Sequence, residues 1–381
     1  WGISPQSIYL WQGMNGWQNY QGEFVNTADL KVNEVECVVD CLTDLCSLQD
    51  HLSLLQHLIV TKKVKKLVQL TGFEKGIDAH MLAYYLQCQS NLRHGFKAVS
   101  VSMDLHGDQA RTHLNNEISA LIDYQRIRYQ NGERMVWTLQ DLEHLDFQSL
   151  PIASEKLHVV TGGTSGLGAA CAEWLVTQGA KYLVICGRSN LPQEHLWSHY
   201  LANHNTDKTA DIIKLITRLR SKGCTVYYYL TPLDDSDRFE RWLDVVLQNG
   251  HSIGYVLHCA GITPKDLSDN DYLDIPNLSD MLMTKLHAGK RLLSTLSRLG
   301  YDKCVLFSSV SSVYPTLASG VLEYSLGNRA LNALAEQYQD GKVISVIWPA
   351  WEQSAANINQ NKHYQRLGLG IFSNEQWFSV L

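Results

Sequence analysis

Residues 157–168 read LHVVTGGTSGLG, an apolar run that passes directly into a glycine-rich turn. A helical pattern, Ala169–Gln178, follows this turn. Between a strand and a helix, TGxxxGxG predicts a phosphate cradle, because glycine permits positive φ and lets the backbone approach a pyrophosphate. The helix N-terminus adds unpaired N–H groups. The residues expected to bind a dinucleotide are Thr161, Gly162, Gly163, Thr164, Ser165, Gly166, Leu167 and Gly168.

Short apolar runs alternate with helical patterns from residue 157 to residue 348. The runs are LHVVT (157–161), YLVIC (182–186), TVYYYL (225–230), YVLHC (255–259), CVLFSS (304–309) and VISVIW (343–348). The helical patterns are Ala169–Gln178, Asp211–Arg220, Asp237–Leu247, Leu278–Leu299 and Tyr324–Tyr338. Apolar strands joined by helical crossovers indicate an α/β fold, a doubly wound parallel sheet covered on both faces.

The first 150 residues repeat this alternation more faintly. The segments 35–42, 65–71 and 96–104 predict strands, 47–59 and 80–89 predict helices, and 126–139 predicts a hairpin around Asn131-Gly132. No glycine-rich turn follows any of these strands, so we expect a Rossmann-like structural subdomain without a cradle. The stretch Asp141–Glu155, with Pro151, is the predicted boundary. It gives a structural subdomain at 1–150 and a catalytic subdomain at 151–381.

The second strand of the catalytic half ends in Gly187-Arg188-Ser189, about twenty residues after the glycine turn. A carboxylate at this place would bind the ribose 2′-hydroxyl of NAD, whereas an arginine suits a 2′-phosphate. Arg188, with Ser189, therefore favours NADPH. The alternative for Arg188 is a solvated surface residue.

The glycine turn resembles that of the short-chain dehydrogenase/reductase superfamily, whose members usually carry Tyr-x-x-x-Lys on the helix after the fifth strand. Here that helix carries Tyr324-Ser325-Leu326-Gly327-Asn328, with Asn in place of Lys. Tyr-x-x-x-Asn marks the ketoreductase domains of polyketide synthases, in which the lysine comes from the preceding long helix. That helix contains Thr284-Lys285-Leu286-His287-Ala288, similar to the family's Pro-Lys-Val-x-Gly segment. The resemblance therefore assigns Lys285 as the transferred lysine.

Three more segments resemble these ketoreductase domains. They are His258-Cys259-Ala260-Gly261, similar to His-Ala-Ala-Gly, then Phe307-Ser308-Ser309-Val310 at the end of the fifth strand, and Trp348-Pro349-Ala350-Trp351, similar to the Trp-Pro-x-Trp form of trans-acyltransferase synthases. The resemblance implies that Ala260 and Gly261 bind the cofactor. The usual carboxylate after the third strand is replaced by Pro232, so Leu233 and backbone groups are expected at the adenine.

The resemblance implies that NADPH reduces a β-keto group, carried on an acyl carrier protein by phosphopantetheine, to a β-hydroxy group. Hydride transfer leaves negative charge on the carbonyl oxygen, which needs a proton donor and hydrogen bonds. Tyr324 is the expected acid, since the ammonium of Lys285 favours the phenolate of a group whose ordinary pKa is about 10. Ser309 is expected to bind the ketone oxygen, and Asn328 to orient the lysine or a water. Ser311 has the family's usual spacing from the tyrosine, whereas the strand end favours Ser309.

Two other functions fit parts of the pattern. A non-catalytic scaffold would keep the fold but lose the chemistry, and all four catalytic residue types are present here. A free-standing dehydrogenase of small alcohols predicts Tyr-x-x-x-Lys, which is absent. The stereochemistry of the alcohol stays open, because Thr263-Pro264-Lys265 stands where one class has Leu-Asp-Asp, and Tyr314 is the nearest residue to the tryptophan mark of the other.

The composition of the 381 residues is that of a globular protein, with 45% hydrophobic and 18% charged residues. The net charge of −6 argues against a nucleic-acid or membrane-surface partner, and no apolar run is long enough to cross a bilayer. The nine cysteines match no zinc or disulfide spacing, so we expect free thiols, no metal, and a cytoplasmic location. The chain begins at Trp1 and stops at Leu381 in mid-pattern, so we expect neighbouring domains of a longer synthase.

Overall fold

The computed structural model forms two compact units. It describes residues 8–11, 17–19, 24–25, 37–41, 48–61, 64–71, 76–104, 107–120, 124–138, 152–204, 206–230, 236–262, 275, 278–351 and 369–373. The first unit comprises Trp1–Glu143, Pro264–Ser279 and Ser311–Ala333, and the second comprises His144–Thr263, Asp280–Val310 and Leu334–Leu381. The units are therefore discontinuous in sequence, whereas the predicted boundary near residue 150 divides the chain once.

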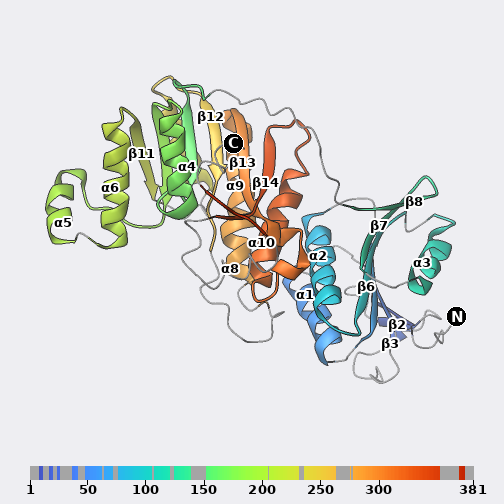
Figure 1. Ribbon diagram of the computed structural model, residues 1–381. Coiled ribbons are helices and arrows are strands. Elements are labelled where there is room, and N and C mark those ends of the chain that lie inside the picture. The colour runs from blue at the N-terminus through green and yellow to red at the C-terminus, as the bar shows by residue number, and fades with distance from the viewer. Residues whose placement is uncertain are drawn as a thin grey trace. The chain divides into compact units, whose positions relative to one another are not determined.

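The second unit holds a six-stranded sheet in which every pairing is parallel (Figure 1). Its strands are β9 (Leu157–Thr161), β10 (Tyr182–Gly187), β11 (Thr225–Leu230), β12 (Ile253–His258), β13 (Tyr301–Ser309) and β14 (Val343–Trp348). The order β11-β10-β9-β12-β13-β14 reverses direction between β9 and β12. In open α/β sheets ligands bind outside the carboxyl ends of the strands at such a reversal. The six predicted strands and the doubly wound fold are confirmed.

The helices of this sheet are the predicted crossovers. They are α4 (Gly166–Thr177), α6 (Lys208–Ser221), α7 (Ser236–Leu247), α8 (Leu278–Leu282) and α9 (Ala288–Leu299). Contacts join α4 to α6 and α7 to α9, and right-handed crossovers put these pairs on opposite faces of the sheet. Four of the helical patterns end before a glycine with positive φ, as capping predicts: Gly179, Gly223, Gly250 and Gly300. The short helices η5 (Glu194–Leu196) and α5 (Trp197–Asn203) were not predicted.

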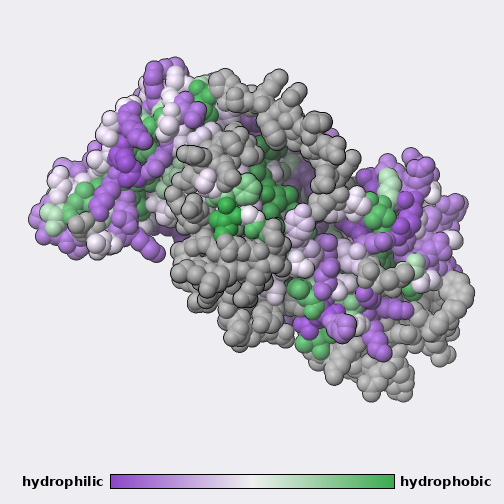
Figure 2. All heavy atoms as spheres, viewed as in Figure 1, coloured by the Kyte–Doolittle hydropathy of each residue, from purple (hydrophilic) through white to green (hydrophobic). Residues whose placement is uncertain are grey.

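Helix α6 shows why these segments fold as they do. Its sequence KTADIIKLITRLRS carries an apolar stripe with helical spacing, and five of its aliphatic side chains are buried: Ile212, Ile213, Leu215, Ile216 and Leu219. The Asp207 carboxylate caps the helix by accepting a hydrogen bond from the amide of Ala210 at 2.7 Å. Hydrophilic residues dominate the outward side of α6 (Figure 2). Burial of each aliphatic side chain stabilises the fold by about 1.5–3 kcal/mol.

The first unit holds an eight-stranded sheet in the order β3-β2-β1-β4-β5-β6-β7-β8. The strands are β1 (Ile8–Trp11), β2 (Trp17–Asn19), β3 (Phe24–Val25), β4 (Cys37–Cys41), β5 (Lys66–Thr71), β6 (Lys97–Ser102), β7 (Gln125–Gln130) and β8 (Glu133–Val136). The predicted hairpin is confirmed: β7 and β8 pair antiparallel around Asn131 and Gly132, both with positive φ. Strands β1–β3 were missed, because two to four residues show no reliable alternation.

Three helical segments follow these strands in the chain: α1 (Leu48–Gln56) with the π-helical turn η4 (His57–Thr61), α2 (Ile77–Leu92) and α3 (Ala110–Ser119). The predicted helices 47–59 and 80–89 are confirmed as α1 and α2. Helix α3 was missed because it is polar: of its ten residues only Glu117 and Ile118 are buried.

Part of the first unit comes from late in the chain. The short helix η8 (Pro315–Leu317) packs against α2, and α10 (Leu322–Ala335) follows it. The Tyr84 hydroxyl on α2 donates a hydrogen bond to the Ser311 carbonyl oxygen, and the Asn332 amide on α10 donates one to the Ser312 hydroxyl at 2.8 Å. Helix α2 thus fixes the start of the segment that leads to α10.

None of the helices in the described ranges is both long and apolar enough to span a lipid bilayer. The described side chains include no group of three or more His, Cys, Asp and Glu residues suited to hold a metal ion.

Candidate active site

The turn after β9 is so tightly folded that glycine is required in it. Gly162 and Gly166 have φ of 68° and 53°, the left-handed region that favours glycine. An ideal Cβ at Gly162 would lie 2.8 Å from the Cα of Ala260, and one at Gly168 would overlap the carbonyl oxygen of Gly162. Both neighbours are backbone atoms that no rotamer change can move. The backbone of the turn therefore packs directly against the backbone of Ala260, with no room for a side chain at Gly162.

The outer side of this turn is open at the N-terminus of α4. Ser165 and Gly166 are exposed at the N-terminus of α4, and an ideal Cβ at Gly166 would meet nothing within 4 Å. The Ser165 side chain makes no capping hydrogen bond to the first turn of the helix. A helix N-terminus with open space above it is a ready site for an anion.

The end of β10 lies against the same turn. An ideal Cβ at Gly187 would overlap the side chain of Thr164 and lie 2.6 Å from the Tyr228 hydroxyl oxygen. That hydroxyl donates a hydrogen bond to the Ser189 carbonyl oxygen at 2.7 Å, which fixes the backbone beside Arg188. Arg188 is exposed and forms no ion pair within the described ranges. Leu233, which is expected at the adenine, and the preceding Pro232 lie outside the described residues.

Lys285 is a buried cation in an unusual turn. It lies in a π-helical segment, η6 (Met283–His287), between α8 and α9, and is 5% exposed. Its Nζ donates a hydrogen bond to the Phe307 carbonyl oxygen on β13 at 3.4 Å. Burial lowers the pKa of Lys285 to about 8. Single π-helical turns are frequent at functional sites, and the pattern 278–299 predicted a helix here without this irregularity.

The end of β12 leaves room for this lysine. An ideal Cβ at Gly261 would lie 3.2 Å from the Nζ of Lys285. The preceding Cys259 stands where the resembling domains have Ala, and burial raises the pKa of its thiol. A thiol of raised pKa is a poor nucleophile, so Cys259 is a packing residue.

The two candidate serines differ in position. Ser309 is the last residue of β13, in register with Trp348 of β14, and is 7% exposed. Ser311 belongs to the short helix η7 (Val310–Ser312), is 1% exposed, and has its carbonyl oxygen bonded to Tyr84. Ser309 thus stands at a carboxyl end of a parallel strand, where α/β proteins bind ligands.

Tyr324 and Asn328 lie one turn apart on α10, as their spacing predicts. Tyr324 is partly buried and Asn328 is fully buried. The Asn328 side-chain amide donates a hydrogen bond to the Tyr324 carbonyl oxygen at 2.9 Å, so the orientation of Asn328 is fixed by its own helix. Both residues belong to the first compact unit, whereas Ser309 and Lys285 belong to the second.

Comparison with known proteins accounts for these motifs. The family model of the KR domain matches residues 157–353, about half of the chain. The chain belongs to the KR domain family. KR domains of polyketide synthases reduce the β-keto group of an intermediate tethered to an acyl carrier protein. As a member, this chain is an oxidoreductase of the ketoreductase type, whose family binds a nicotinamide cofactor, NAD(P)H.

Curated relatives agree with this membership. The chain is 30% identical over 258 residues to polyketide synthase PksL of Bacillus subtilis, covering 66% of this chain and 6% of that protein. It is 29% identical over 260 residues to 6-methylsalicylic acid synthase of Aspergillus niger, covering 64% of this chain and 14% of that protein. The chain therefore spans only a small part of these curated relatives.

Two solved structures share the fold of this KR domain. A ketoreductase domain from the bacillaene assembly line superposes with a TM-score of 0.70 at 18% identity, covering 90% of this chain and 82% of that one. An A-type ketoreductase from a modular polyketide synthase superposes with a TM-score of 0.70 at 21% identity, covering 93% of this chain and 76% of that one.

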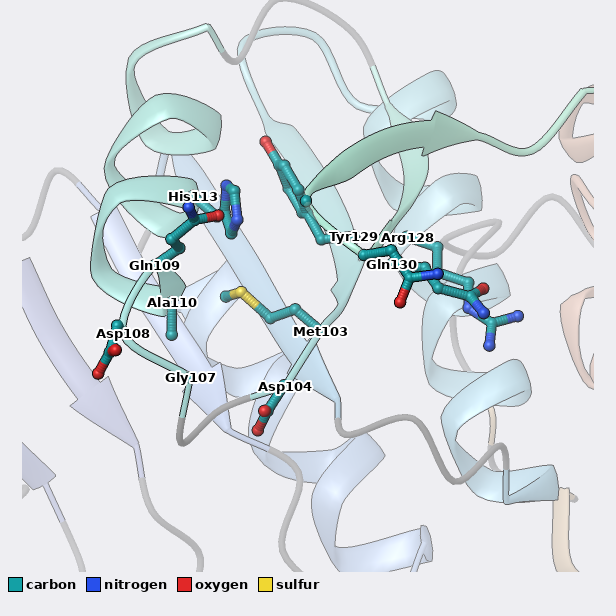
Figure 3. Close-up of a pocket in the computed structure, with 12 residues that line it drawn as sticks. Met103, Asp104, Gly107, Asp108, Gln109, Ala110, His113, Arg128, Tyr129 and Gln130 are labelled. Carbon is teal, nitrogen blue, oxygen red and sulfur yellow. The ribbon is translucent and has the colours of Figure 1, made fainter.

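The first unit contains a pocket of about 410 Å³ at the carboxyl ends of β6 and β7 (Figure 3). In Figure 3 the Met103 side chain points toward Ala110 on α3, and His113 lies beside Tyr129. The two rings stack with centroids 3.8 Å apart. Two exposed carboxylates, Asp104 and Asp108, line the pocket. They would repel the phosphates of a dinucleotide.

Sequence reasoning missed three features of this KR domain. Thr161 was expected only in the cradle, yet its hydroxyl lies 2.8 Å from the buried Nδ1 of His258. His258 itself was noted only as part of a motif; a histidine inside an apolar strand was the available signal. The contribution of Tyr84 carries no sequence signal, because its partner is a backbone carbonyl 227 residues away.

Proposed function

We propose that this KR domain uses NADPH to reduce the β-keto group of an acyl chain bound by phosphopantetheine to an acyl carrier protein. The single observation that supports this best is the buried Lys285 ammonium beside Gly261, which follows β12, the strand that pairs with β9 before the glycine turn. Such a cation suits an enzyme that must stabilise a developing alkoxide and make a phenol acidic. A scaffold has no use for a buried cation that costs desolvation energy.

The bound nicotinamide would supply the hydride. We propose that Tyr324 donates a proton to the carbonyl oxygen of the substrate as negative charge develops there. The Lys285 ammonium favours the phenolate that remains. Ser309 is the proposed hydrogen-bond donor to the ketone oxygen, and its place at the end of β13 supports it over Ser311. Asn328, oriented by its bond to the Tyr324 carbonyl, would hold the lysine or a water of the proton relay.

NADPH rather than NADH is proposed because of the exposed Arg188 at the end of β10. Its guanidinium can bind a 2′-phosphate with two parallel hydrogen bonds. The Tyr228 bond to Ser189 supports the same assignment, because it fixes the backbone beside the arginine. Ala260 and Gly261 are the proposed contacts to the nicotinamide end of the cofactor, because the backbone of Ala260 packs directly against Gly162 of the glycine turn.

The first unit is proposed to have a structural role without a dinucleotide of its own. Its pocket at the strand ends carries Asp104 and Asp108 rather than a glycine cradle. The trans-acyltransferase type of the parent synthase, neighbouring synthase domains and a cytoplasmic location also remain proposals, the first supported by Trp348-Pro349-Ala350-Trp351.

The test is a reaction with a β-ketoacyl chain loaded on an acyl carrier protein. Purified protein should oxidise NADPH in proportion to a product that is two hydrogen atoms heavier by mass spectrometry. The same chain on free pantetheine should react more slowly, because the carrier protein adds binding surface. No reaction with either substrate would favour the scaffold function.

A further inference from the structure

His258 is a buried histidine that the proposed chemistry does not use. It is the last residue of β12 and is fully buried. Its Nδ1 lies 2.8 Å from the Thr161 hydroxyl oxygen, and its Nε2 lies 3.2 Å from the Lys285 carbonyl oxygen. The ring therefore joins the head of the glycine turn to the π-helical segment η6.

The partners of the ring determine its tautomer. A carbonyl oxygen only accepts hydrogen bonds, so Nε2 must carry the proton and donate it to Lys285. In the neutral ring Nδ1 is then the acceptor, and the Thr161 hydroxyl donates to it. The amide of Ala260 donates in turn to the Thr161 oxygen at 3.4 Å. Burial lowers the pKa of His258 to about 4, so the ring is neutral at pH 7.

The carbonyl that His258 contacts is part of the irregular turn. The Ala288 amide donates to the carbonyl oxygens of both Lys285 and Met283, so the π-helical turn closes around the lysine. The Lys285 oxygen has two lone pairs, and the imidazole supplies a second donor for it. Without that donor, relaxation of the turn to α-helix would rotate Lys285 about the helix axis, away from Phe307.

We propose that His258 is a positioning residue for Lys285: its Nε2–H holds the π-helical turn in the register that aims the ammonium past Gly261 to the Phe307 carbonyl oxygen. The Thr161 hydroxyl complements this tautomer by donating a hydrogen bond to Nδ1. Thr161, the first residue of the glycine turn, thus contacts the same imidazole that holds the Lys285 carbonyl oxygen. The catalytic meaning of this inference rests on the proposed function, but the geometry does not.

Two substitutions of His258 by amide residues distinguish the contact made by Nδ1 from the contact made by Nε2. In His258→Gln the side-chain amide reaches the place of Nε2 and can still donate to the Lys285 carbonyl oxygen. In His258→Asn the amide reaches only the place of Nδ1, keeping the Thr161 contact and losing the lysine contact. The two variants thus have similar polarity and differ in the one bond that matters.

The decisive readout is the pKa of Lys285, followed by NMR of protein labelled with ¹³Cε-lysine and assigned with Lys285→Met. The wild type and His258→Gln should titrate near 8, and His258→Asn should shift toward the ordinary value of 10.5 as the ammonium reaches solvent. His258→Asn should also lower kcat about 10- to 100-fold, the loss typical of a displaced catalytic group. NADPH affinity should change much less.

An unchanged Lys285 pKa and kcat in His258→Asn would overturn the proposal, as would identical behaviour of the two variants. If His258→Asn does not fold, the tautomer is measured in the wild type by long-range ¹H–¹⁵N NMR. A protonated Nε2 with bare Nδ1 at pH 7 supports the proposal, and a protonated Nδ1 overturns it. Protein that shows the expected titrations but reduces no ketone would sink the proposed function and leave the positioning intact.

Discussion

The missing side chain of Gly261 makes room for Lys285, whose Cε and Nζ would lie 3.1 and 3.2 Å from an ideal Cβ at residue 261. The atoms in the way are the far end of a flexible side chain. An added methyl group would therefore displace the ammonium rather than disrupt the backbone. A side chain added at residue 261 should therefore affect activity more than stability.

Gly261→Ala should lower kcat about 10-fold or more by displacing the Lys285 ammonium. Stability should fall by less than about 1 kcal/mol, because no backbone atom blocks the new Cβ. Gly76→Ala is the matched control, since Gly76 has a φ of −67° and open space around its Cβ position. Full activity of Gly261→Ala would show that the lysine tolerates the displacement.

The rate of reduction should fall at alkaline pH because Lys285 is buried. Burial lowers its pKa from the ordinary 10.5 to about 8, so the ammonium is lost as pH rises through that value. The neighbouring Cys259 and His258 stay neutral near pH 8, because burial raises the pKa of the thiol and lowers that of the imidazole to about 4. A kcat/KM profile should therefore decline above about pH 8, and a flat profile up to pH 10 would contradict this.

The same shift predicts how stability depends on pH. Between about pH 8 and 10.5 the unfolded chain keeps a proton on Lys285 that the folded chain has released. The contribution of Lys285 to the free energy of unfolding should therefore rise with pH in this window. Lys285→Met should remove that rise from urea-unfolding measurements.

Arg188→Ala should reduce the preference for NADPH over NADH about 10- to 100-fold, the loss of one charge-assisted phosphate contact. The KM for NADPH should rise while the KM for NADH stays nearly constant. Lys222→Ala, which removes an exposed charge of the same sign elsewhere in the second unit, is the control. Equal changes in both KM values would mean that Arg188 is only a solvated residue.

Tyr84→Phe should destabilise the first unit by about 1–3 kcal/mol, because the buried Ser311 carbonyl oxygen loses its donor. Thermal unfolding measures this cost. Tyr314→Phe alters an exposed tyrosine of the same segment and should cost much less. Equal melting temperatures of the two variants would show that the Tyr84 bond does not anchor the segment.

The sequence was sufficient for the parts of this fold that repeat a strong pattern. The six strands of the second unit are apolar runs bounded by glycines and helical stripes, and each was predicted within a few residues. The short strands β1–β3 and the polar helix α3 lack such patterns, since other elements rather than their own residues determine them. The glycine turn could be predicted because a side chain at Gly162 or Gly168 would clash with neighbouring backbone atoms, so only glycine fits there.

The candidate site was predictable as residue types but not as geometry. Resemblance to the ketoreductase domains identified Tyr324, Asn328 and Lys285. The π-helical turn around Lys285, the His258 bond to its carbonyl oxygen and the room left by Gly261 depend on contacts between elements that are distant in sequence. The periodicity of apolar residues predicts which face of a helix is buried. It does not predict where one turn contains an extra residue, as the π-helical turn at Lys285 does.

The most direct test of the account compares the wild type with Tyr324→Phe in NADPH-dependent reduction of a carrier-bound β-ketoacyl chain. Loss of the proposed acid should lower kcat at least about 100-fold, while NADPH binding and the melting temperature stay close to those of the wild type. Tyr338→Phe, just beyond the end of α10, should keep full activity. A Tyr324→Phe enzyme that reduces the ketone at the wild-type rate would contradict the central claim.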